Sequence, residues 1–315
     1  MKSFFFCFLF FIRFLLADAF TSDLYSKIKD IYDPSIDDYI EIQNYLSYEF
    51  RPLLNRLDSW QYRGKALEFR FIGRNDDEQI EHGVIPVNCE ESDRNNCILL
   101  YCSFNHEYPK CLKKLVERIK NSDFKGHIIY RIGGWPDLEG GSLVFSHIPY
   151  AFKISSFREA LRLGFKRAFW LDASVVPVCS LNDIFKVIEE KGYFTYVSPY
   201  NMKELANEEV CQIMGVPYSE ADQIPAFVAG ILGFNFENER ALEAVRRWVD
   251  ITKNHEEAYF SPRQDLCVIS IILYQLGLTD ANQGGEKATY DIKEIDRPGL
   301  QFYLDKFATQ PNWPN

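Results

Sequence analysis

The segment Arg167-Ala-Phe-Trp-Leu-Asp172-Ala-Ser174 is a short apolar run that ends on an acid. Such a run is typical of a strand that is buried on both faces of a sheet. Three similar segments lie around it, and these are 97–104, 126–131 and 193–197. Apolar residues three or four apart predict helices between them, over 108–122, 155–163 and 181–191. Gly164 and Gly192 follow two of these helices at the position where helices commonly end. This alternation predicts an α/β fold, with βαβ units in a mostly parallel, Rossmann-like sheet and helices on both faces.

Polar residues follow the predicted strands at one edge of this sheet. They lie in Ser103–His106, Arg131–Trp135 and Asp172–Ser174. In open α/β sheets, ligands bind beyond the carboxyl ends of the strands. We therefore expect the functional site at this edge.

Composition excludes some classes of partner. Of the 315 residues, 47% are hydrophobic and 25% are charged, which is the balance of a folded globular protein. The formal net charge is −10, and an acidic surface repels the phosphates of nucleic acids. Nucleic acid is therefore not an expected partner, and a small anionic ligand would need a local cluster of basic groups.

The N-terminus has the pattern of a secretory signal peptide. Lys2 precedes the apolar run 3–12, Arg13 interrupts the apolar residues, and Ala17-Asp18-Ala19 ends them. An arginine in the middle of a membrane span would cost about 2.5–3.5 kcal/mol. The sequence therefore predicts export with cleavage after Ala19. The alternative is an uncleaved leader that anchors a lumenal or periplasmic domain, and this leader is the one expected membrane contact.

The region after the leader reads differently from the rest of the chain. Helical spacing of apolar residues predicts a helical extension over 20–60, alternation predicts a strand over 66–73, and the polar stretch 74–96 reads as a linker or loop. The expected organisation is a signal peptide, a helical N-terminal region with linker, and an α/β domain: 1–19, 20–95 and 96–315.

Cysteine usage argues against a zinc site built on thiolates. No C-x-x-C pair occurs, and seven cysteines remain after the leader. Cys89 and Cys97 lie in a polar stretch and are the most plausible disulfide in an oxidising compartment.

Three segments together resemble the GT-A family of nucleotide-sugar-dependent glycosyltransferases. Asp172-Ala173-Ser174 resembles the family's D-x-D element. Phe227-Val-Ala229-Gly230-Ile-Leu-Gly233-Phe-Asn235 is similar to the small-residue strand that faces the bound donor. Ser261-Pro-Arg-Gln-Asp265 opens an apolar helix over 266–277 and is similar to the acidic element near the acceptor. The likeness covers roughly 96–278 and implies transfer of a sugar from a nucleotide-sugar to a glycan, lipid or protein acceptor.

The resemblance also assigns residues to roles. Asp172 and Asp265 are the expected catalytic residues, with Asp265 as a general base or an orienting acceptor for the acceptor hydroxyl. Lys153 is the first candidate for a contact to the donor phosphates, because cationic donors stabilise a leaving pyrophosphate, and Arg131 is the second. The expected donor-binding residues are Ser103, Phe104, Asn105, Arg131, Lys153, Arg158, Asp172, Ser174, Ala229 and Gly230.

The D-x-D element departs from the family pattern at its third position, where Ser174 replaces an acid. Mn²⁺ or Mg²⁺ prefers oxygen ligands and commonly takes one or two carboxylates with phosphates. Asp172 supplies one carboxylate. Either Asp172, water, phosphate and a residue distant in the sequence hold the ion, or transfer needs no metal.

A second function from another class fits the same features. A secreted glycan-binding or interaction protein could retain the fold without catalysis, and the missing second acid favours it. A hydrolase on the same sheet is a weaker alternative, because no G-x-S-x-G nucleophile element occurs.

Overall fold

The structure is a computed structural model that describes residues 60–62, 65–67, 81–102, 108–132, 148, 150–259, 261, 263–283 and 287–304. The predicted leader, nearly all of the predicted N-terminal helical region, and Ser103–Asn105 lie outside the described residues. A short antiparallel pair, β1 (Trp60–Tyr62) with β2 (Lys65–Leu67), is the described part of the chain before residue 81.

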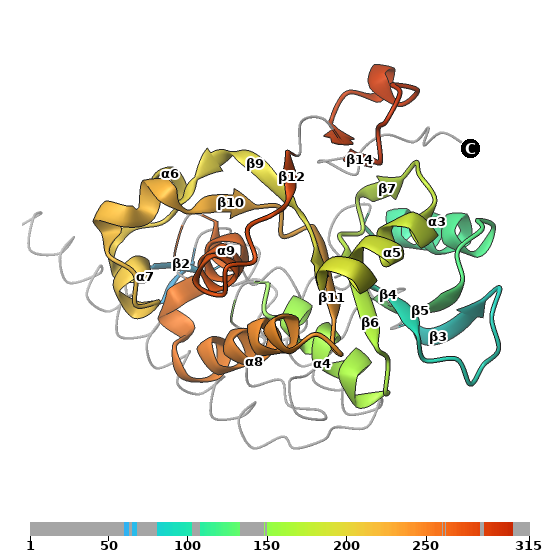
Figure 1. The fold of residues 1–315 in the computed structure, drawn as a ribbon, viewed down its shortest axis with the longest axis horizontal. Helices are drawn as coiled ribbons and strands as arrows, with labels where there is room; N and C mark the ends of the chain where they lie inside the picture. The colour runs from blue at the N-terminus through green and yellow to red at the C-terminus, as the bar shows by residue number, and fades with distance from the viewer. Residues whose placement is uncertain are drawn as a thin grey trace, which may run out of the picture.

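A six-stranded sheet forms the centre of the molecule (Figure 1). Its strands, in spatial order, are β3 (Glu81–Val87), β5 (Gly126–Ile132), β4 (Asn96–Cys102), β6 (Arg167–Leu171), β11 (Ile231–Asn235) and β8 (Tyr193–Phe194). Strand β4 pairs in parallel with both β5 and β6. Strands β3 and β11 run the other way, since β3 is antiparallel to β5, and β11 is antiparallel to β6 and β8. The four predicted parallel strands are present and share one direction, but the sheet as a whole is mixed.

The prediction of a linker over 74–96 was wrong, because this stretch contains the edge strand β3. Its side chains alternate between half-buried and exposed, and three of its seven residues, Glu81, His82 and Gly83, are polar or small. Pro86 is tolerated in a strand with one unpaired side. Polarity at a sheet edge thus made a strand look like a loop.

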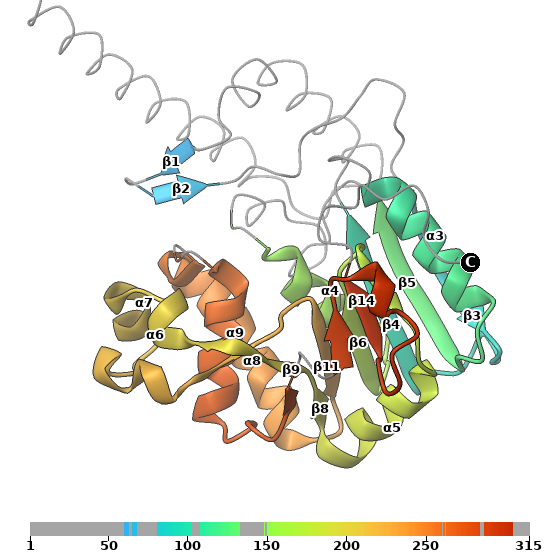
Figure 2. The same ribbon diagram turned by 90° about the horizontal axis from the view of Figure 1, so that it is seen from above.

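In the described part of the chain, five helices of eleven residues or more cover the two faces of the sheet (Figure 2). On one face lie α3 (Tyr108–Lys120) and α5 (Leu181–Lys191), and on the other lie α4 (Phe152–Arg162), α8 (Glu239–Asn254) and α9 (Gln264–Gln275). A hydrophobic core lies on each face of the sheet, and alternate residues of a strand point into one core or the other. In β4, Ile98 and Leu100 face α3, whereas Leu99 and Tyr101 face α4. The chain therefore leaves β4 on one face and leaves β5 on the other, which creates a topological switch point between β4 and β6.

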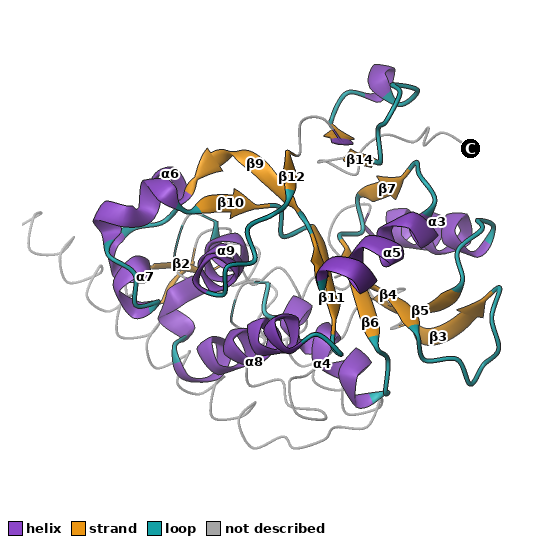
Figure 3. Ribbon diagram, viewed as in Figure 1, coloured by secondary structure: helices purple, strands orange, loops and turns teal. Residues whose placement is uncertain are grey.

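Two small sheets extend from the carboxyl edge of the central sheet (Figure 3). In one, β9 (Tyr196–Asn201) lies between β10 (Pro225–Phe227) and β12 (Asn282–Gln283). In the other, β14 (Phe302–Leu304) lies between β13 (Ala288–Thr289) and β7 (Val175–Pro177). The remaining helices are short, and they are α6 (Met202–Leu205), α7 (Glu208–Ile213), η2 (Tyr218–Gln223), η3 (Glu256–Tyr259) and η4 (Ile292–Glu294). No helix in the described part of the chain is long and apolar enough to cross a membrane.

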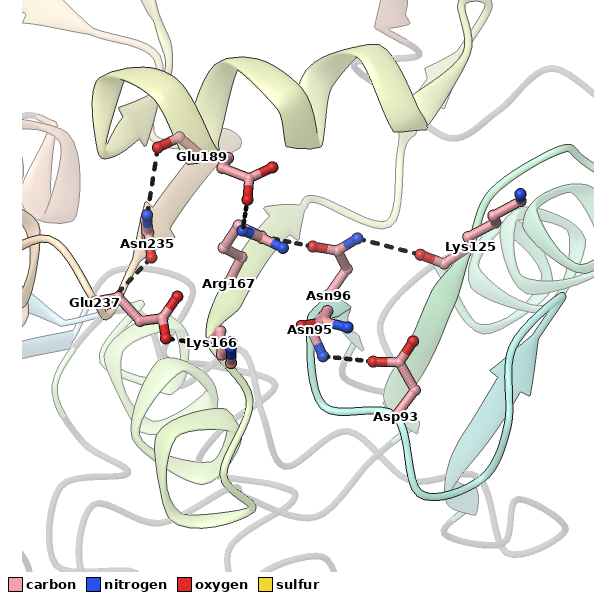
Figure 4. A network of polar contacts seen from close by, with 9 residues as sticks. All are labelled: Asp93, Asn95, Asn96, Lys125, Lys166, Arg167, Glu189, Asn235 and Glu237. Atoms are coloured by element: carbon pink, nitrogen blue, oxygen red, sulfur yellow. Dashed lines mark hydrogen bonds and ion pairs between the residues drawn. The ribbon is translucent and has the colours of Figure 1, made fainter.

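The opposite edge of the sheet is closed by polar contacts (Figure 4). Arg167, at the start of β6, pairs with Glu189 at 2.6 Å and donates to the Asn96 side chain at 2.8 Å. Asn235, at the end of β11, donates to the Glu189 carbonyl at 3.4 Å. These contacts tie α5 to three strand ends, on the side away from the predicted site.

The predicted disulfide between Cys89 and Cys97 is absent, and both are free thiols. The Cys89 thiol donates to the Gly126 carbonyl at 3.1 Å, whereas Cys97 lies in the core between the sheet and α4. Burial raises the pKa of the Cys97 thiol, which keeps it protonated and unreactive.

Candidate functional site

Lys153, in the first turn of α4, joins the two acids that the sequence singled out. Its ammonium lies 3.2 Å from Asp172 Oδ1 and 2.8 Å from Asp265 Oδ2. It also donates to the Ala229 carbonyl at 3.1 Å. An ammonium has three N–H donors. One hydrogen bond and two ion pairs thus bring residues from α4, the β6 end, the β10–β11 connection and α9 together at one atom.

Asp172 directly follows β6 and is the more open of the two acids, with 39% of its side chain exposed. Its Oδ1 accepts from the Trp170 indole at 2.7 Å as well as from Lys153. Its backbone N–H donates to the Gly230 carbonyl at 2.9 Å. A Cβ at Gly230 would lie 2.6 Å from Asp172 Oδ2. A residue without a side chain is therefore required beside this carboxylate.

Asp265 lies in the first turn of α9 and is only 6% exposed. Burial raises the pKa of its carboxyl, and the Lys153 ammonium opposes that rise. The positive end of the helix dipole also favours the ionised form. A carboxylate with a raised pKa is a better base than one in water.

Only 3% of the Lys153 side chain is exposed. Burial alone would lower the pKa of this lysine, but Asp172 and Asp265 more than offset it, and the pKa is raised. The Tyr150 and Trp170 rings lie 5.3 and 5.8 Å from its nitrogen. Tyr150 has φ of +62°, a conformation that costs a non-glycine residue about 1–2 kcal/mol. Backbone strain of this kind is concentrated at functional sites.

The structure thus brings together Asp172, Lys153, Ala229, Gly230 and Asp265 from the predicted set. Ser174 lies close by, half-buried in the turn that links Asp172 to β7.

Two predicted donor-binding residues lie elsewhere. Arg131, two strands away on β5, pairs with Glu159 at 3.9 Å. Arg158 is five residues beyond Lys153 on α4, which is roughly 140° around the helix, so the two side chains leave it on different faces. The roles of both arginines in donor binding remain predictions. Ser103, Phe104 and Asn105 lie outside the described residues.

Two aromatic residues of the site were missed from the sequence. Trp170 was interpreted as a strand residue, yet its indole orients Asp172. Tyr150 was given no role. The one available signal was the spacing Trp170-Leu-Asp172, because alternate residues at a strand end lie on the same side.

The residues around Asp172 do not fit a divalent cation. Two donors already share its Oδ1, and the ammonium of Lys153 would repel a second cation at this carboxylate. Among the described residues, no group of three or more His, Cys, Asp or Glu side chains is arranged to hold a metal ion. Lys153 already places a positive charge beside Asp172.

No known family model matches the sequence, and a search among curated proteins found no match. Among solved structures, the chain is similar to the galactosyltransferase LgtC in complex with donor and acceptor sugar analogues, with 14% identity and a TM-score of 0.37. It is also similar to a glutamine-to-glutamate active-site mutant of LgtC, with 13% identity and a TM-score of 0.32. Each match covers 66% of this chain and 86% of the other. At this level of similarity, function has to be inferred from the chain's own residues.

Proposed function

We propose that this chain transfers a sugar from a nucleotide-sugar donor to an acceptor hydroxyl, without a divalent cation. The observation that supports this most strongly is the bridge that Lys153 makes between Asp172 and Asp265. It holds one open and one buried carboxylate at the switch point of the sheet, where ligands bind in α/β folds.

Each group has a separate part in the proposed reaction. The acceptor oxygen forms a bond to the anomeric carbon of the donor, the bond from that carbon to the pyrophosphate oxygen breaks, and nucleoside diphosphate leaves. Asp265 takes the proton of the acceptor hydroxyl, which its raised pKa favours. Asp172, which faces solvent, accepts hydrogen bonds from hydroxyls of the donor sugar.

Lys153 is a positioning residue in this proposal. The sequence suggested it as a phosphate contact, but its donors are already directed at Asp172, Asp265 and the Ala229 carbonyl. It fixes the two carboxylates relative to one another and opposes the rise that burial causes in the pKa of Asp265. The phosphate-binding groups then have to come from the ends of β4 and β5, where Arg131 and Ser103–Asn105 were predicted to bind the donor.

Donor binding is tested by thermal unfolding with a panel of nucleotide-sugars, with and without Mn²⁺ or EDTA. A donor at a hundred times its dissociation constant adds about 2.7 kcal/mol of stability. In a domain of this size that raises Tm by roughly 5–10 °C. We expect the shift with one donor, unchanged by EDTA and lost in Asp172→Asn.

The matched control is Asp280→Asn, which removes a carboxylate that is 87% exposed and pairs with Lys191 on the surface. It should keep the full shift. Release of nucleoside diphosphate then separates catalysis from binding. A chain that binds oligosaccharide but neither binds nor cleaves any donor is the non-catalytic glycan-binding protein that the sequence left open. A shift that needs Mn²⁺ contradicts the metal-free proposal.

We further propose that the chain is exported, on the strength of the leader over residues 1–19. N-terminal sequencing of the protein recovered from the medium of secreting cells should begin at Phe20. Recovery of the uncleaved chain in the membrane fraction would favour the anchored alternative.

A further inference from the structure

Two exposed tyrosines lie beside the candidate site and take no part in the reaction proposed above. Tyr200, on β9, is 52% exposed, and Tyr290, just after β13, is 65% exposed. Few large hydrophobic side chains of the described residues are this open, and the others are Val84, Leu161 and Leu163. We call Tyr200 and Tyr290 the tyrosine rim.

Strand pairing places Tyr290 near Asp172. Thr289 of β13 pairs with Tyr303 of β14, and the next residue of β14, Leu304, pairs with Val175 of β7. Val175 follows the Asp172–Ser174 turn directly. Tyr290 continues β13 in the direction of Leu304 and so approaches the same end of β7.

The electrostatic environment of Tyr290 agrees with this placement. Partial burial of its hydroxyl raises its pKa, the negative charge of Asp172 and the neighbouring Tyr200 raise it further, and Arg263 lowers it. Arg263 is the residue before α9, two positions ahead of Asp265. Charges from both halves of the site, Asp172 and Arg263, thus act on the Tyr290 hydroxyl.

Tyr200 reaches the site from the other small sheet. Strand β9 pairs with β10, which leads into Ala229 and Gly230. The chain after β9 forms α6, whose last residue, Leu205, accepts from the Cys267 thiol of α9 at 3.4 Å. In this register Asn201 lies opposite Pro225 and Val197 opposite Phe227, so Tyr200 is beside the start of β10, one residue before the strand end that leads into α6 and its contact with α9.

We infer that the tyrosine rim is a subsite for the acceptor, in which the two rings stack on a pyranose ring of a neutral oligosaccharide. A tyrosine offers a flat apolar face with a polar tip, which matches the alternating C–H and O–H groups of a sugar. An exposed ring with little conformational freedom also loses little entropy when it binds.

The acceptor fits this position better than the nucleotide does. The donor's nucleotide was assigned to the ends of β4 and β5, which lie on one side of β6. The rim is instead associated with Arg263, which affects the Tyr290 hydroxyl and lies two residues ahead of Asp265, the base proposed for the acceptor. The identification of the bound sugar as the acceptor rests on the proposed transfer reaction. Stacking of a sugar on the two rings does not require catalysis.

The test measures binding of cellotriose, maltotriose and chitotriose, and separately of UDP and GDP, by ligand-observed NMR titration. Alanine at Tyr200 or Tyr290 should weaken binding of the preferred oligosaccharide about 3- to 10-fold, and the double variant about 10- to 100-fold. Tyr200→Phe and Tyr290→Phe keep the ring and should stay within about twofold of wild type. Leu161→Ala, an exposed apolar change on α4, is the distal control.

Several results would overturn the inference. They are wild-type affinity in the alanine variants, failure of the wild-type chain to bind any of the three oligosaccharides, and weakened binding of UDP or GDP in place of the sugar. The last result would make the rim a stacking site for the nucleotide base. Binding of oligosaccharide without cleavage of any donor would refute the transfer reaction but leave the subsite standing.

Discussion

Lys153 is placed where a positive charge is otherwise unfavourable. It lies in the first turn of a helix, at the positive end of the dipole, and almost all of its side chain is buried. Two carboxylates and a carbonyl compensate for this placement. Removing one member of a buried ion pair leaves an uncompensated charge, which costs more than the pair itself contributes. The cluster therefore makes a prediction about stability that is independent of any substrate.

Replacing Lys153 with methionine should destabilise the chain by about 3–5 kcal/mol at pH 8, because Asp265 is left buried without its counter-charge. The pKa of Asp265 is already raised by burial and rises further without the ammonium. A group whose pKa is raised on folding contributes stability at low pH that is lost as pH rises through the folded value. The deficit of Lys153→Met relative to wild type, measured by urea unfolding, should therefore shrink from pH 8 to pH 5.

The double variant Lys153→Met/Asp265→Asn is the control for this effect. It removes the buried carboxylate together with the lysine, so it should be more stable than Lys153→Met alone at pH 8. Its deficit should also depend less on pH. A deficit in Lys153→Met that grows on acidification would show that Asp265 is not the group responsible.

Gly230 gives a second prediction at the scale of one residue. An alanine Cβ would lie 2.6 Å from Asp172 Oδ2, so Gly230→Ala has to displace the carboxylate. We expect the donor-dependent Tm shift to fall by at least half, with a small loss of intrinsic stability. In Gly215→Ala, the new Cβ meets nothing within 4 Å, but φ is +71°. This control should cost about 1 kcal/mol through strain alone and leave the shift intact. Equal loss of the shift in both variants would count against the packing explanation.

At the scale of elements, hydrophobic patterning predicted most of the strands and helices that are buried in the core. Strands β4, β5, β6 and β8 and helices α3 and α5 lie close to where the apolar runs and helix-ending glycines indicated. Strand β3 was missed because it begins with Glu81, His82 and Gly83 and contains Pro86, so its apolar residues form no long run. The reversal of β11 could not be predicted, since its apolar residues read the same in either direction. That reversal matters for the site, because it sets Gly230 beside Asp172.

Among the site residues, the sequence identified the acids and the lysine but not their contacts. Asp172, Asp265 and Lys153 follow from strand ends and helix starts, which periodicity can locate. That one ammonium bridges both acids depends on how α4 and α9 pack across the sheet, and no local pattern encodes that distance. For the same reason, the exposed rings of Tyr200 and Tyr290 had no signal in a chain with many aromatic residues.

Helix α8 allows a test of how much an N-terminal cap stabilises one element. The Asn238 side chain accepts from the backbone of Arg240 and Ala241, each at 3.1 Å, and so caps the helix start. Asn238→Ala should cost about 1 kcal/mol in urea unfolding. Asn254→Ala, at the other end of the same helix, removes only an exposed contact to Asp250 and should cost less than half of that. Comparable losses at the two ends would exclude capping as the cause.

At the scale of the whole molecule, the two edges of the sheet have different roles. At one edge, Arg167 contacts Asn96 and Glu189 and so joins strands and a helix (Figure 4). The other edge carries Lys153 and the two acids. Strand β6 connects the edges, because Arg167 is its first residue and Asp172 follows its last. At about 3.3 Å per residue, the two side chains are attached roughly 16 Å apart. Changes at such a distance, with no shared partner, are expected to act independently.

This separation gives the last prediction, which compares the two ends of one strand. Arg167→Gln leaves Asn96 and Glu189 without their cationic partner, and we expect a loss of about 1–3 kcal/mol in urea unfolding while the donor-dependent Tm shift stays at its wild-type size. Asp172→Asn keeps an oxygen for Trp170 and Lys153 and should cost less than about 1 kcal/mol, yet abolish the shift. The double variant should show the sum of the two stability changes and no donor response. If Arg167→Gln also removed the donor shift, the site would extend through the sheet, and the assignment of function to its carboxyl edge alone would be wrong.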